Sequence, residues 1–557
     1  MIKIIELNND EKIIEIINKL SSDISHVILK ENTTKINKDV LETLNLDNYS
    51  AVVDFTVNGY YINDCRYFGD EKITANKWFS NNVLYPNIIF KVEDLKWLLD
   101  RHEWASLLDI CVKAVVELEN IFINGHVIFD FDEKSSNNYL DLNNYEDDDY
   151  VNHFYLNKWL LINNQKAQFN RKNTTLPNNA RMIDKVMYRS YFKLPNKIYL
   201  NMHHQSLMKQ KNAVNIYHKN KDAIKPYIVF LGFDYGYRGN SKYLFEYIKN
   251  HTNFTVYFIT DEQQGESFVS PQHSETQNLI EQAQVLVLES YIPDGLKPNG
   301  TIIQLWHGTP IKKLFLDSNE LHQNKNIYNY RARKYNKLIK HNYFITDTKE
   351  INSVFNTAFP MQETKIISSG YPRNQFLIEH NEDNQLISQI KEDLQLNNYK
   401  QTILYVPTWR DNKEEQYLLE FPKEITDHYN IIYKCHIEDK NIKKTNYIDP
   451  LDYETQQLIL VADMLISDYS SIIFDALTID KKVYLYTPDF ESYKYHRGLY
   501  EEVFNTVNQN QYFESNKMFE AISNQHYIKV NSKYINKNNH SYETIQSIID
   551  KHMNKNR

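Results

Sequence analysis

Cysteine is scarce in this sequence, with three residues among 557. Cys65, Cys111 and Cys435 lie far apart and form no Cys-x-x-Cys pair. This usage argues against a disulfide framework and a zinc site, and it fits a reducing cytoplasm.

Long apolar runs are absent too. Charges interrupt every apolar stretch of the first twenty residues, so we expect no signal peptide. No run of about 18 apolar residues could span a bilayer, so any membrane association is expected to be peripheral.

An excess of positive charge is also missing, because the formal net charge is −9 at pH 7. This excludes a general nucleic-acid binder. The motif-bearing segments contain no Walker P-loop, His-Glu-x-x-His or Gly-x-Ser-x-Gly pattern, which argues against an NTPase, a zincin protease and an α/β-hydrolase. What is present is a composition typical of folded proteins, with 42% hydrophobic and 24% charged residues. The length predicts about two to four domains.

Residues 1–200 differ in pattern from the rest and are interpreted as an accessory domain of unknown role. Strand-like runs lie at 51–55 and 126–129, and apolar residues recur at helical spacing over 92–119. Asp130 and Asp132 form an Asp-x-Asp pair of the kind that holds a metal in some sugar transferases. A solvated strand end is the preferred interpretation, because two such acids are common by chance.

From Pro226 onward, buried-strand runs alternate with helical segments, which predicts parallel α/β sheets. We expect strands at 227–231, 254–259, 285–288, 301–306, 402–406, 431–434, 464–467 and 483–486, and a helix at 241–249. The rhythm restarts near residue 395. It predicts two Rossmann-like domains, at 225–385 and 390–535, that face each other across a cleft, followed by a C-terminal helix or tail at 536–557. Ligands bind such sheets beyond the carboxyl ends of the strands.

A histidine follows the strand that is expected to end at Trp306, in the segment Trp306-His307-Gly308-Thr309-Pro310-Ile311-Lys312. Thr309 suits a helix N-cap and Pro310 the first helical position, so we expect a helix to begin there. His307 then faces the cleft, where an imidazole can take a proton near neutral pH. The alternative is a histidine that only bonds the backbone at the strand end, and the Gly-Thr-Pro context favours the first interpretation.

Two further motifs follow strands of the second unit. Thr408 and Arg410 belong to Val-Pro-Thr-Trp-Arg-Asp, and Arg410 could clamp a phosphate or pair with Asp411. His436 ends the next strand, where it could donate to a diphosphate oxygen or lie at the edge of the core. Both alternatives stay open for each residue.

The most specific motif is Ser467-Asp468-Tyr469-Ser470-Ser471, which continues into an apolar helical run that contains Asp475. Ser470 suits an N-cap, and two hydroxyls beside the free N–H groups of a first helical turn form an anion site. This chemistry fits a diphosphate, and Asp475 is expected to orient a hydroxyl or a loop. A weaker segment contains Arg497 and Gly498, which could close over a ligand.

Taken together, these motifs resemble the CDP-glycerol glycerophosphotransferase family, whose members prime or polymerise teichoic acid and related capsule polymers. The resemblance covers residues 225–530, including a landmark at Ser369-Gly370-Tyr371-Pro372-Arg373-Asn374. It implies a GT-B-type fold and transfer of glycerol phosphate or ribitol phosphate from CDP-glycerol or CDP-ribitol, with release of CMP. It departs from the family pattern at Ile437, where the motif usually reads His-Pro.

The same resemblance implies roles for the candidate residues. His307 would be the general base, and His436 would act on the diphosphate as a second catalytic residue. The donor-binding candidates are Thr408, Arg410, Ser470, Ser471, Asp475 and Arg497, and the acceptor-side candidates are Gly308, Thr309 and Lys312. No metal-ligand set or cofactor motif is evident, so metal independence is predicted.

The acceptor implied by the family is a lipid-linked, undecaprenyl-type molecule or the growing polymer, so peripheral attachment to the inner face of the cell membrane is expected. A basic, aromatic stretch at 325–341 could lie on an anionic membrane or be an ordinary solvated helix. The competing functions are a GT-B glycosyltransferase that uses a nucleotide sugar and a non-catalytic scaffold. The sequence leaves open the polyol, primase or polymerase action, and whether the chain forms a homo-oligomer.

Overall fold

The computed structural model describes residues 1–7, 13–42, 44, 46, 49–61, 86–101, 107–118, 121–131, 214–318, 330–408, 419–434 and 447–554. The chain divides into two compact units. The first contains Met1–Ile216 and Leu321–Asn336, and the second contains Tyr217–Glu320 and Lys337–Arg557. No helix in the described ranges is long and apolar enough to cross a membrane.

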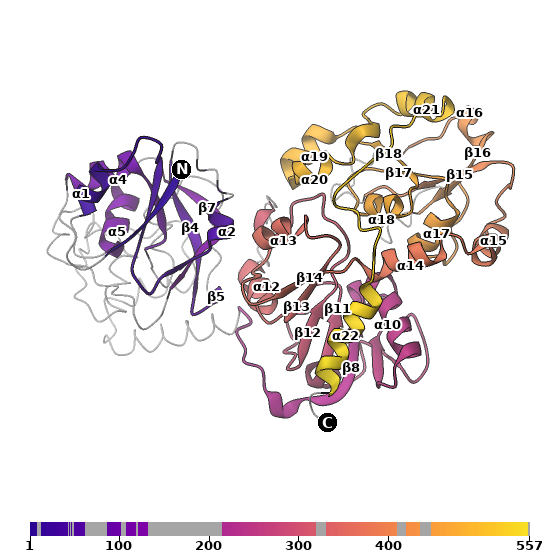
Figure 1. The fold of residues 1–557 in the computed structure, drawn as a ribbon, viewed down its shortest axis with the longest axis horizontal. Coiled ribbons are helices and arrows are strands. Elements are labelled where there is room, and N and C mark those ends of the chain that lie inside the picture. Colours follow the sequence, from indigo (N-terminus) through magenta and orange to yellow (C-terminus); the bar gives the residue numbers. More distant parts are fainter. Residues whose placement is uncertain are drawn as a thin grey trace, which may run out of the picture. The chain divides into compact units, whose positions relative to one another are not determined.

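The first unit is built on a mixed seven-stranded sheet in the order β1-β2-β6-β4-β7-β3, with β5 paired to β4 (Figure 1, indigo). Its strands are β1 (Ile2–Glu6), β2 (His26–Lys30), β3 (Lys35–Ile36), β4 (Ser50–Val57), β5 (Tyr60–Tyr61), β6 (Ile88–Lys91) and β7 (Ile121–Phe131), and its helices are α1 (Ile13–Asn18), α2 (Lys38–Leu41), α4 (Val92–Leu99) and α5 (Leu107–Glu117). Alternate residues of the strands face opposite cores, because side chains alternate across a strand. Val27 and Val52 pack with α1, α4 and α5, whereas Ile28 and Val53 pack with α2.

Two sequence predictions fall in this unit. The helical spacing over 92–119 corresponds to two helices, α4 and α5, instead of one. Asp130 accepts hydrogen bonds from the Thr56 hydroxyl and the Gly59 N–H, each at 2.8 Å, so its carboxylate fastens the turn after β4. Asp132 lies outside the described residues.

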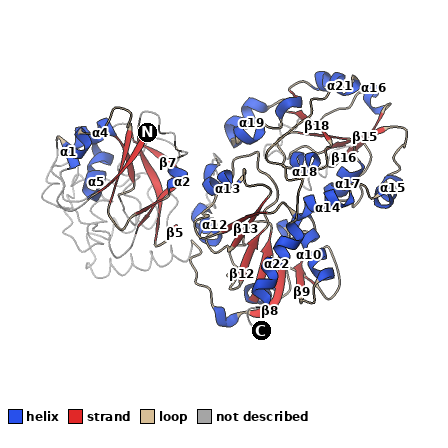
Figure 2. Ribbon diagram, in the orientation of Figure 1, coloured by secondary structure: helices blue, strands red, loops and turns tan. Residues whose placement is uncertain are grey.

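The second unit contains two wholly parallel sheets (Figure 2). The first Rossmann-like domain has the strand order β10-β9-β8-β11-β12-β13-β14, and the second has β16-β15-β17-β18-β19. The strands of the first are β8 (Lys225–Leu231), β9 (Val256–Ile259), β10 (Phe268–Val269), β11 (Ala283–Leu288), β12 (Thr301–Gln304), β13 (Tyr343–Thr346) and β14 (Lys365–Ser368); those of the second are β15 (Gln401–Tyr405), β16 (Tyr429–Tyr433), β17 (Met464–Ser467), β18 (Lys482–Tyr486) and β19 (Gln511–Tyr512). The predicted fold class, a GT-B-type pair of Rossmann-like domains, is confirmed.

Helices cover both faces of these sheets. The first domain carries α10 (Gly239–His251), α11 (Thr276–Gln282), α13 (Asn352–Ala358) and α14 (Pro372–His380), and the second carries α15 (Asn384–Asp393), α16 (Lys423–Thr426), α17 (Thr455–Val461), α18 (Ile472–Thr478), α19 (Phe490–Arg497), α20 (Glu501–Phe504) and α21 (Ser515–Ser523). The boundary between the two units falls within α12 (Tyr330–Leu338), whose residues up to Asn336 belong to the first unit. The last helix, α22 (Ser541–Met553), returns to the first domain and lies beside α10 (Figure 1). Ile545 and Ile549 are buried in the core of that domain, so this segment is an integral part of it and no free tail.

The basic stretch at 325–341 is described from residue 330 onward, as helix α12 and the turn after it. Arg331 and Lys337 are each only 1% exposed, and Tyr335 is buried as well. Arg331 lies 3.9 Å from the Asp54 carboxylate, and the Lys337 ammonium donates to the carbonyl of Leu296. The membrane-surface interpretation is therefore wrong for these three side chains, because they are packed inside the protein.

Candidate functional site

A cavity of about 1040 Å³ lies between the two Rossmann-like domains, where the carboxyl ends of both sets of parallel strands meet. We call it the cleft. His307, Gly308 and Lys312 line it from the first domain, and Ser470 and Ser471 line it from the second. The structure thus brings together five of the candidate residues that the sequence places on separate motifs.

His307 follows β12 and is fixed in one orientation. Its Nδ1 lies 3.2 Å from the backbone carbonyl oxygen of Glu289, and its ring contacts the rings of Phe233 and Trp306. A carbonyl oxygen only accepts, so Nδ1 carries the proton and Nε2 keeps a lone pair. Burial lowers the pKa of His307 to about 4, and the positive charges of Arg373 and Lys312 act in the same direction. The imidazole is therefore neutral at pH 7 and can accept a proton.

Glu289 supports this histidine from the end of β11. Its carboxylate accepts from the N–H groups of Asn240 and Ser241 at 2.9 and 3.0 Å, so it caps the start of α10. Asn240 in turn donates to the Trp306 carbonyl at 2.8 Å and accepts from the Arg373 N–H at 3.1 Å. Burial raises the pKa of Glu289, and the bonds from α10 oppose that shift. One polar network thus fixes the ends of β11 and β12 and the start of α14.

Gly308 lets the two domains approach closely beside His307. Its φ is +123°, which L side chains rarely adopt. A Cβ at this position would lie 2.5 Å from the Arg373 guanidinium and 2.7 Å from the Ser471 hydroxyl. The Ser471 hydroxyl also lies 3.4 Å from the His307 carbonyl oxygen. The glycine is therefore required by contact as well as by backbone conformation.

Asp475 does not line the cleft. It is 1% exposed and accepts from the Arg373 guanidinium at 2.9 and 3.1 Å and from Gln456 at 3.2 Å. Its place behind Arg373 fits an orienting role and differs from direct contact with a donor. Arg373 itself lines the cleft, with its charge held at the boundary of the two domains.

The serine pair lies directly before α18. Ser471 is the residue preceding the helix, and the Ser470 hydroxyl accepts from the Ile472 N–H at 3.4 Å. The N-cap is therefore Ser471, the residue after the predicted Ser470, and its side chain makes no cap hydrogen bond. The Asp468 carboxylate fastens the preceding loop, because it accepts from the Thr408 N–H at 2.9 Å and from the Thr408 hydroxyl. Thr408 is thus bound to Asp468 and does not line the cleft.

The helix predicted to begin at Thr309 does not form. Lys312 instead makes an antiparallel bridge with Leu499, the Lys313 N–H donates to the Gly498 carbonyl at 3.0 Å, and the Tyr500 N–H donates to the Ile311 carbonyl at 2.8 Å. Pairing with the second domain therefore holds this segment extended. Thr309 is buried away from the cleft, and its hydroxyl has no hydrogen-bond partner within the described residues.

A second bridge between the domains runs through Glu454 at the start of α17. Its carboxylate pairs with the Lys242 ammonium and accepts from the Gly239 N–H at 3.2 Å. The structure places Arg497 as the last residue of α19, outside the lining of the cleft. Arg410 and His436 lie outside the described residues. Among the described residues, no three His, Cys, Asp or Glu side chains form a group that could hold a metal.

Arg373, Glu289 and Asn240 are site residues that the sequence did not reveal as such. Glu289 directly follows β11, so its position at a strand end was an available signal. Arg373 lies in the Gly-Tyr-Pro-Arg-Asn landmark, where a Pro marks a helix start. Neither signal identifies the partners, which are the start of α10 for Glu289 and Asp475 of the second domain for Arg373.

A family model described as CDP-Glycerol:Poly(glycerophosphate) glycerophosphotransferase matches residues 213–552, well over half of the chain, and this range contains the cleft and its lining. The chain belongs to this family. Similar family members include a teichoic acid poly(glycerol phosphate) polymerase of Bacillus spizizenii, 35% identical over 220 residues, which are 36% of this chain and 55% of that protein. A teichoic acid glycerol-phosphate transferase of Staphylococcus aureus is 29% identical over 283 residues, 46% of this chain and 72% of that protein.

The chain spans about half the length of the first curated relatives that it matches. Among solved structures, the wall teichoic acid polymerase TagF superposes with a TM-score of 0.54 at 24% identity, over 68% of this chain and all of that chain. This similarity shows that the family fold is present here.

Proposed function

We propose that this protein transfers a polyol-phosphate unit from a CDP-activated donor to a hydroxyl group of a polyol-phosphate acceptor and releases CMP. The observation that carries the proposal is His307, whose Nδ1 bonds the Glu289 carbonyl while the imidazole lines the cleft opposite Ser470 and Ser471. Membership of the family and the names of the relatives support the same chemistry.

In this reaction the Nε2 of His307 takes the proton of the acceptor hydroxyl. The acceptor oxygen attacks the phosphorus next to the polyol, and the bond between that phosphorus and the bridging oxygen of the diphosphate breaks. That oxygen leaves with CMP. A phosphate is a stable anion at neutral pH, so the leaving group requires no proton donor. The neutral state of His307 at pH 7 suits the first step.

Stabilisation of the diphosphate is assigned to groups on the other side of the cleft. The N–H groups at the start of α18 and the hydroxyls of Ser470 and Ser471 suit phosphate oxygens. Arg373, which belongs to the first domain, adds a fixed positive charge that Asp475 orients. Phosphoryl transfer depends mainly on such positioning and electrostatic stabilisation. The roles of His436 and Arg410 stay predictions.

Glycerol phosphate is the favoured unit, because the 35% identity to a glycerol-phosphate enzyme exceeds the 25% identity to a ribitol-phosphate polymerase. The relatives are named as teichoic acid enzymes. We therefore propose a wall-polymer acceptor carried by an undecaprenyl-type lipid, with this chain acting at the inner face of the membrane.

The deciding experiment incubates the purified protein with CDP-glycerol or CDP-ribitol and a short lipid-linked acceptor. CMP release and acceptor mass are measured together. We expect CMP and a product that grows by glycerol-phosphate units. No CMP from either donor, with an acceptor that a known polymerase extends, would overturn the proposal and favour a nucleotide-sugar glycosyltransferase.

A His307→Ala variant separates an enzyme from a scaffold. Loss of a general base costs about 10²- to 10⁴-fold in kcat. Binding of CDP-glycerol is expected to stay within about threefold of wild type, because the donor phosphates contact the other domain. If transfer by the variant equals that of wild type, His307 is not the base.

A further inference from the structure

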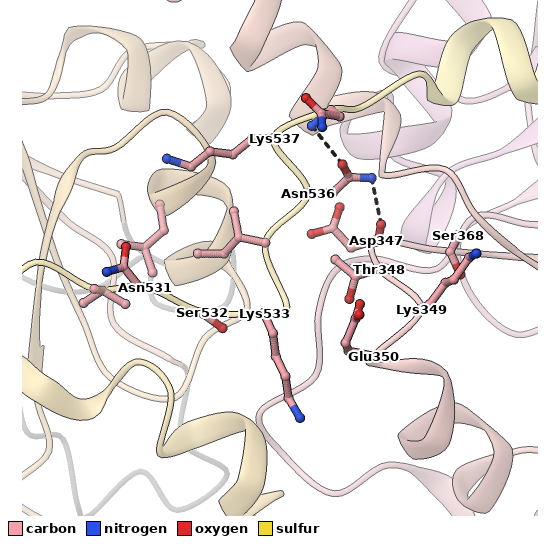
Figure 3. A pocket seen from close by; sticks show the side chains of 14 residues that line it. Asp347, Thr348, Lys349, Glu350, Ser368, Asn531, Ser532, Lys533, Asn536 and Lys537 are labelled. Atoms are coloured by element: carbon pink, nitrogen blue, oxygen red, sulfur yellow. Dashed lines mark hydrogen bonds between the residues drawn. The ribbon is translucent and has the colours of Figure 1, made fainter.

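A second cavity, of about 600 Å³, lies apart from the cleft and shares no lining residue with it. We call it the Asp347 pocket. Figure 3 shows Asp347, Thr348 and Glu350 on one side and the segment 531–537 on the other, with the Asp347 carboxyl group between them. The Asn536 amide donates to the Asp347 carbonyl oxygen at 3.0 Å and so joins the two walls. This volume is in the range of small-molecule sites.

The pocket lies on the same sheet edge as His307. β12, β13 and β14 are neighbours and parallel, so their carboxyl ends point the same way. His307 follows β12, Asp347 follows β13, and Ser368 ends β14. Adjacent strands lie about 4.8 Å apart, so Asp347 is one strand from the segment that carries the proposed base. A ligand in the pocket is therefore on the ligand-binding edge of the acceptor-side domain.

Asp347 has the features of an unfilled binding group. Its side chain is fully buried, and neither carboxylate oxygen has a hydrogen-bond partner among the described residues. The Asn536 backbone N–H and the Asn374 side chain are both close enough to favour the ionised form of Asp347, yet neither makes a hydrogen bond of normal geometry to the carboxylate. Burial raises the pKa of Asp347 to about 8, and the charge of Asp475 acts in the same direction. An unsatisfied buried carboxyl is costly unless something pairs with it.

The rest of the lining indicates the ligand class. Thr348, Ser368, Ser532, Asn531, Asn536 and Asn538 contribute hydroxyl and amide groups to the lining of the same pocket. Lys349 and Lys533 are exposed lining residues. Glu350 also lines the pocket, and its negative charge offsets one of these positive charges. Lys537 is paired with Asp480. The balance of charge is positive while Asp347 is neutral. None of the 14 described lining residues is aromatic, so there is no platform on which a base could stack. A ligand that matches this lining therefore has hydroxyl groups that bind the carboxyl group and a phosphate that binds the lysines.

We propose that the Asp347 pocket binds a polyol phosphate, with a polyol hydroxyl on the Asp347 carboxyl and a phosphate between Lys349 and Lys533. The proposal rests on the proposed function, because the acceptor of that reaction carries this chemistry. The bound unit is then a part of the acceptor chain distant from the reacting hydroxyl. The same group also occurs in phosphatidylglycerol headgroups, so the source is decided by experiment.

The full-length protein is titrated by calorimetry with a soluble glycerol-phosphate oligomer, without nucleotide. We expect Lys349→Glu and Lys533→Glu each to weaken binding at least tenfold. Lys365→Glu is the matched control, because Lys365 is an exposed lysine at the opposite end of β14 and its reversal should leave binding unchanged. Asp347→Asn is expected to weaken oligomer binding several-fold and to leave binding of inorganic polyphosphate unchanged. Melting curves establish that each variant is folded.

A parallel arm uses phosphatidylglycerol vesicles, with phosphatidylcholine vesicles as the reference. Lysine-dependent binding of the oligomer alone identifies polymer as the source, and lysine-dependent binding of vesicles identifies the headgroup. If the wild type binds neither probe, or if Lys349→Glu and Lys365→Glu behave alike, the proposal is overturned. No donor is present, so a failure of the proposed transfer activity does not affect these results.

Discussion

A single hydrogen bond and burial together determine the chemistry of the His307 side chain. The Glu289 carbonyl selects the tautomer, and burial lowers the pKa to about 4. Only the neutral imidazole can take a proton, so activity is present above that pKa and is lost as the pH falls through it. An imidazole of ordinary pKa would lose activity near pH 6.5.

We therefore expect kcat/KM to change little between pH 7 and pH 5.5 and to fall in the region of pH 4 to 5. The measurement is the initial rate of CMP release at low donor concentration, with circular dichroism at each pH to confirm folding. An acid limb centred near 6.5 would contradict the burial of His307.

Asp347 gives a prediction of the opposite sign. Its folded-state pKa of about 8 exceeds the ordinary value of 3.8, so the unfolded chain binds fewer protons between those two values. Stability contributed by this group therefore falls as the pH rises from about 4 to 8.

Asp347→Asn removes this ionisation. We expect the variant to be more stable than wild type at pH 8 by about 1 to 2 kcal/mol. The shift of the Asp347 pKa would imply a larger gain, at about 1.4 kcal/mol per pKa unit. The gain is smaller because the buried amide of the variant also lacks hydrogen-bond partners. The gain should shrink toward pH 4. Urea unfolding at several pH values tests this, and a constant difference across the range would contradict it.

At the residue level the sequence predicts a role where local context is enough. His307, Ser470 and Ser471 each follow a buried strand, and the cleft contains all three. Asp475 and Thr408 were assigned to donor binding, yet the structure binds them to Arg373 and Asp468. Such pairings join segments about 60 to 100 residues apart, and no local pattern records them.

At the scale of an element, the loop after β12 depends on Gly308, because the two domains approach each other closely at this residue. Gly308→Ala adds a Cβ that would lie 2.5 Å from Arg373, at a φ of +123°. We expect a loss of about 10²-fold or more in transfer rate, because small misplacements at a reacting centre are costly. Gly295→Ala is the matched control, since a Cβ there meets nothing within 4 Å. Steady-state rates of both variants test this, and equal rates would show that the loop adapts.

Strands were the best predicted elements of the second unit. The run 464–467 coincides with β17, and 285–288 lies within β11, because a strand buried on both faces is a continuous apolar run. The helix predicted from Thr309 was wrong, because Thr and Pro suit a helix start in isolation whereas pairing with Leu499 holds the segment extended. Local propensity yields here to a contact between domains.

On the scale of the whole molecule, Tyr500 joins the two Rossmann-like domains by hydrogen bonds. Its hydroxyl donates to the Asp317 carboxylate at 2.7 Å and accepts from the Leu314 N–H at 3.2 Å. Tyr500→Phe removes both bonds, at a cost of about 1 kcal/mol, so we expect the KM for the donor to rise about fivefold with a smaller change in kcat. Tyr495→Phe, at a side chain that is 78% exposed, is the control. An unchanged KM in Tyr500→Phe would show that donor binding does not depend on this contact.

The sequence predicted two Rossmann-like domains from their repeated rhythm, and it could not predict which segments return. The described residues 330–336 belong with the first unit, and α22 belongs with the first Rossmann-like domain. Both assignments depend on buried surfaces that are distant in sequence. A helix at the end of a chain carries no local mark of the core that receives it.

The return of α22 has a mechanical consequence. The chain leaves the first Rossmann-like domain after α14 and comes back between α21 and α22, so two covalent links join the lobes. Two domains that are connected at two points rotate most easily about the axis through both connections, and rotation about other axes is restricted. The second connection includes residues 530–538, which form one wall of the Asp347 pocket. A ligand in that pocket would therefore contact one of the two segments that connect the domains.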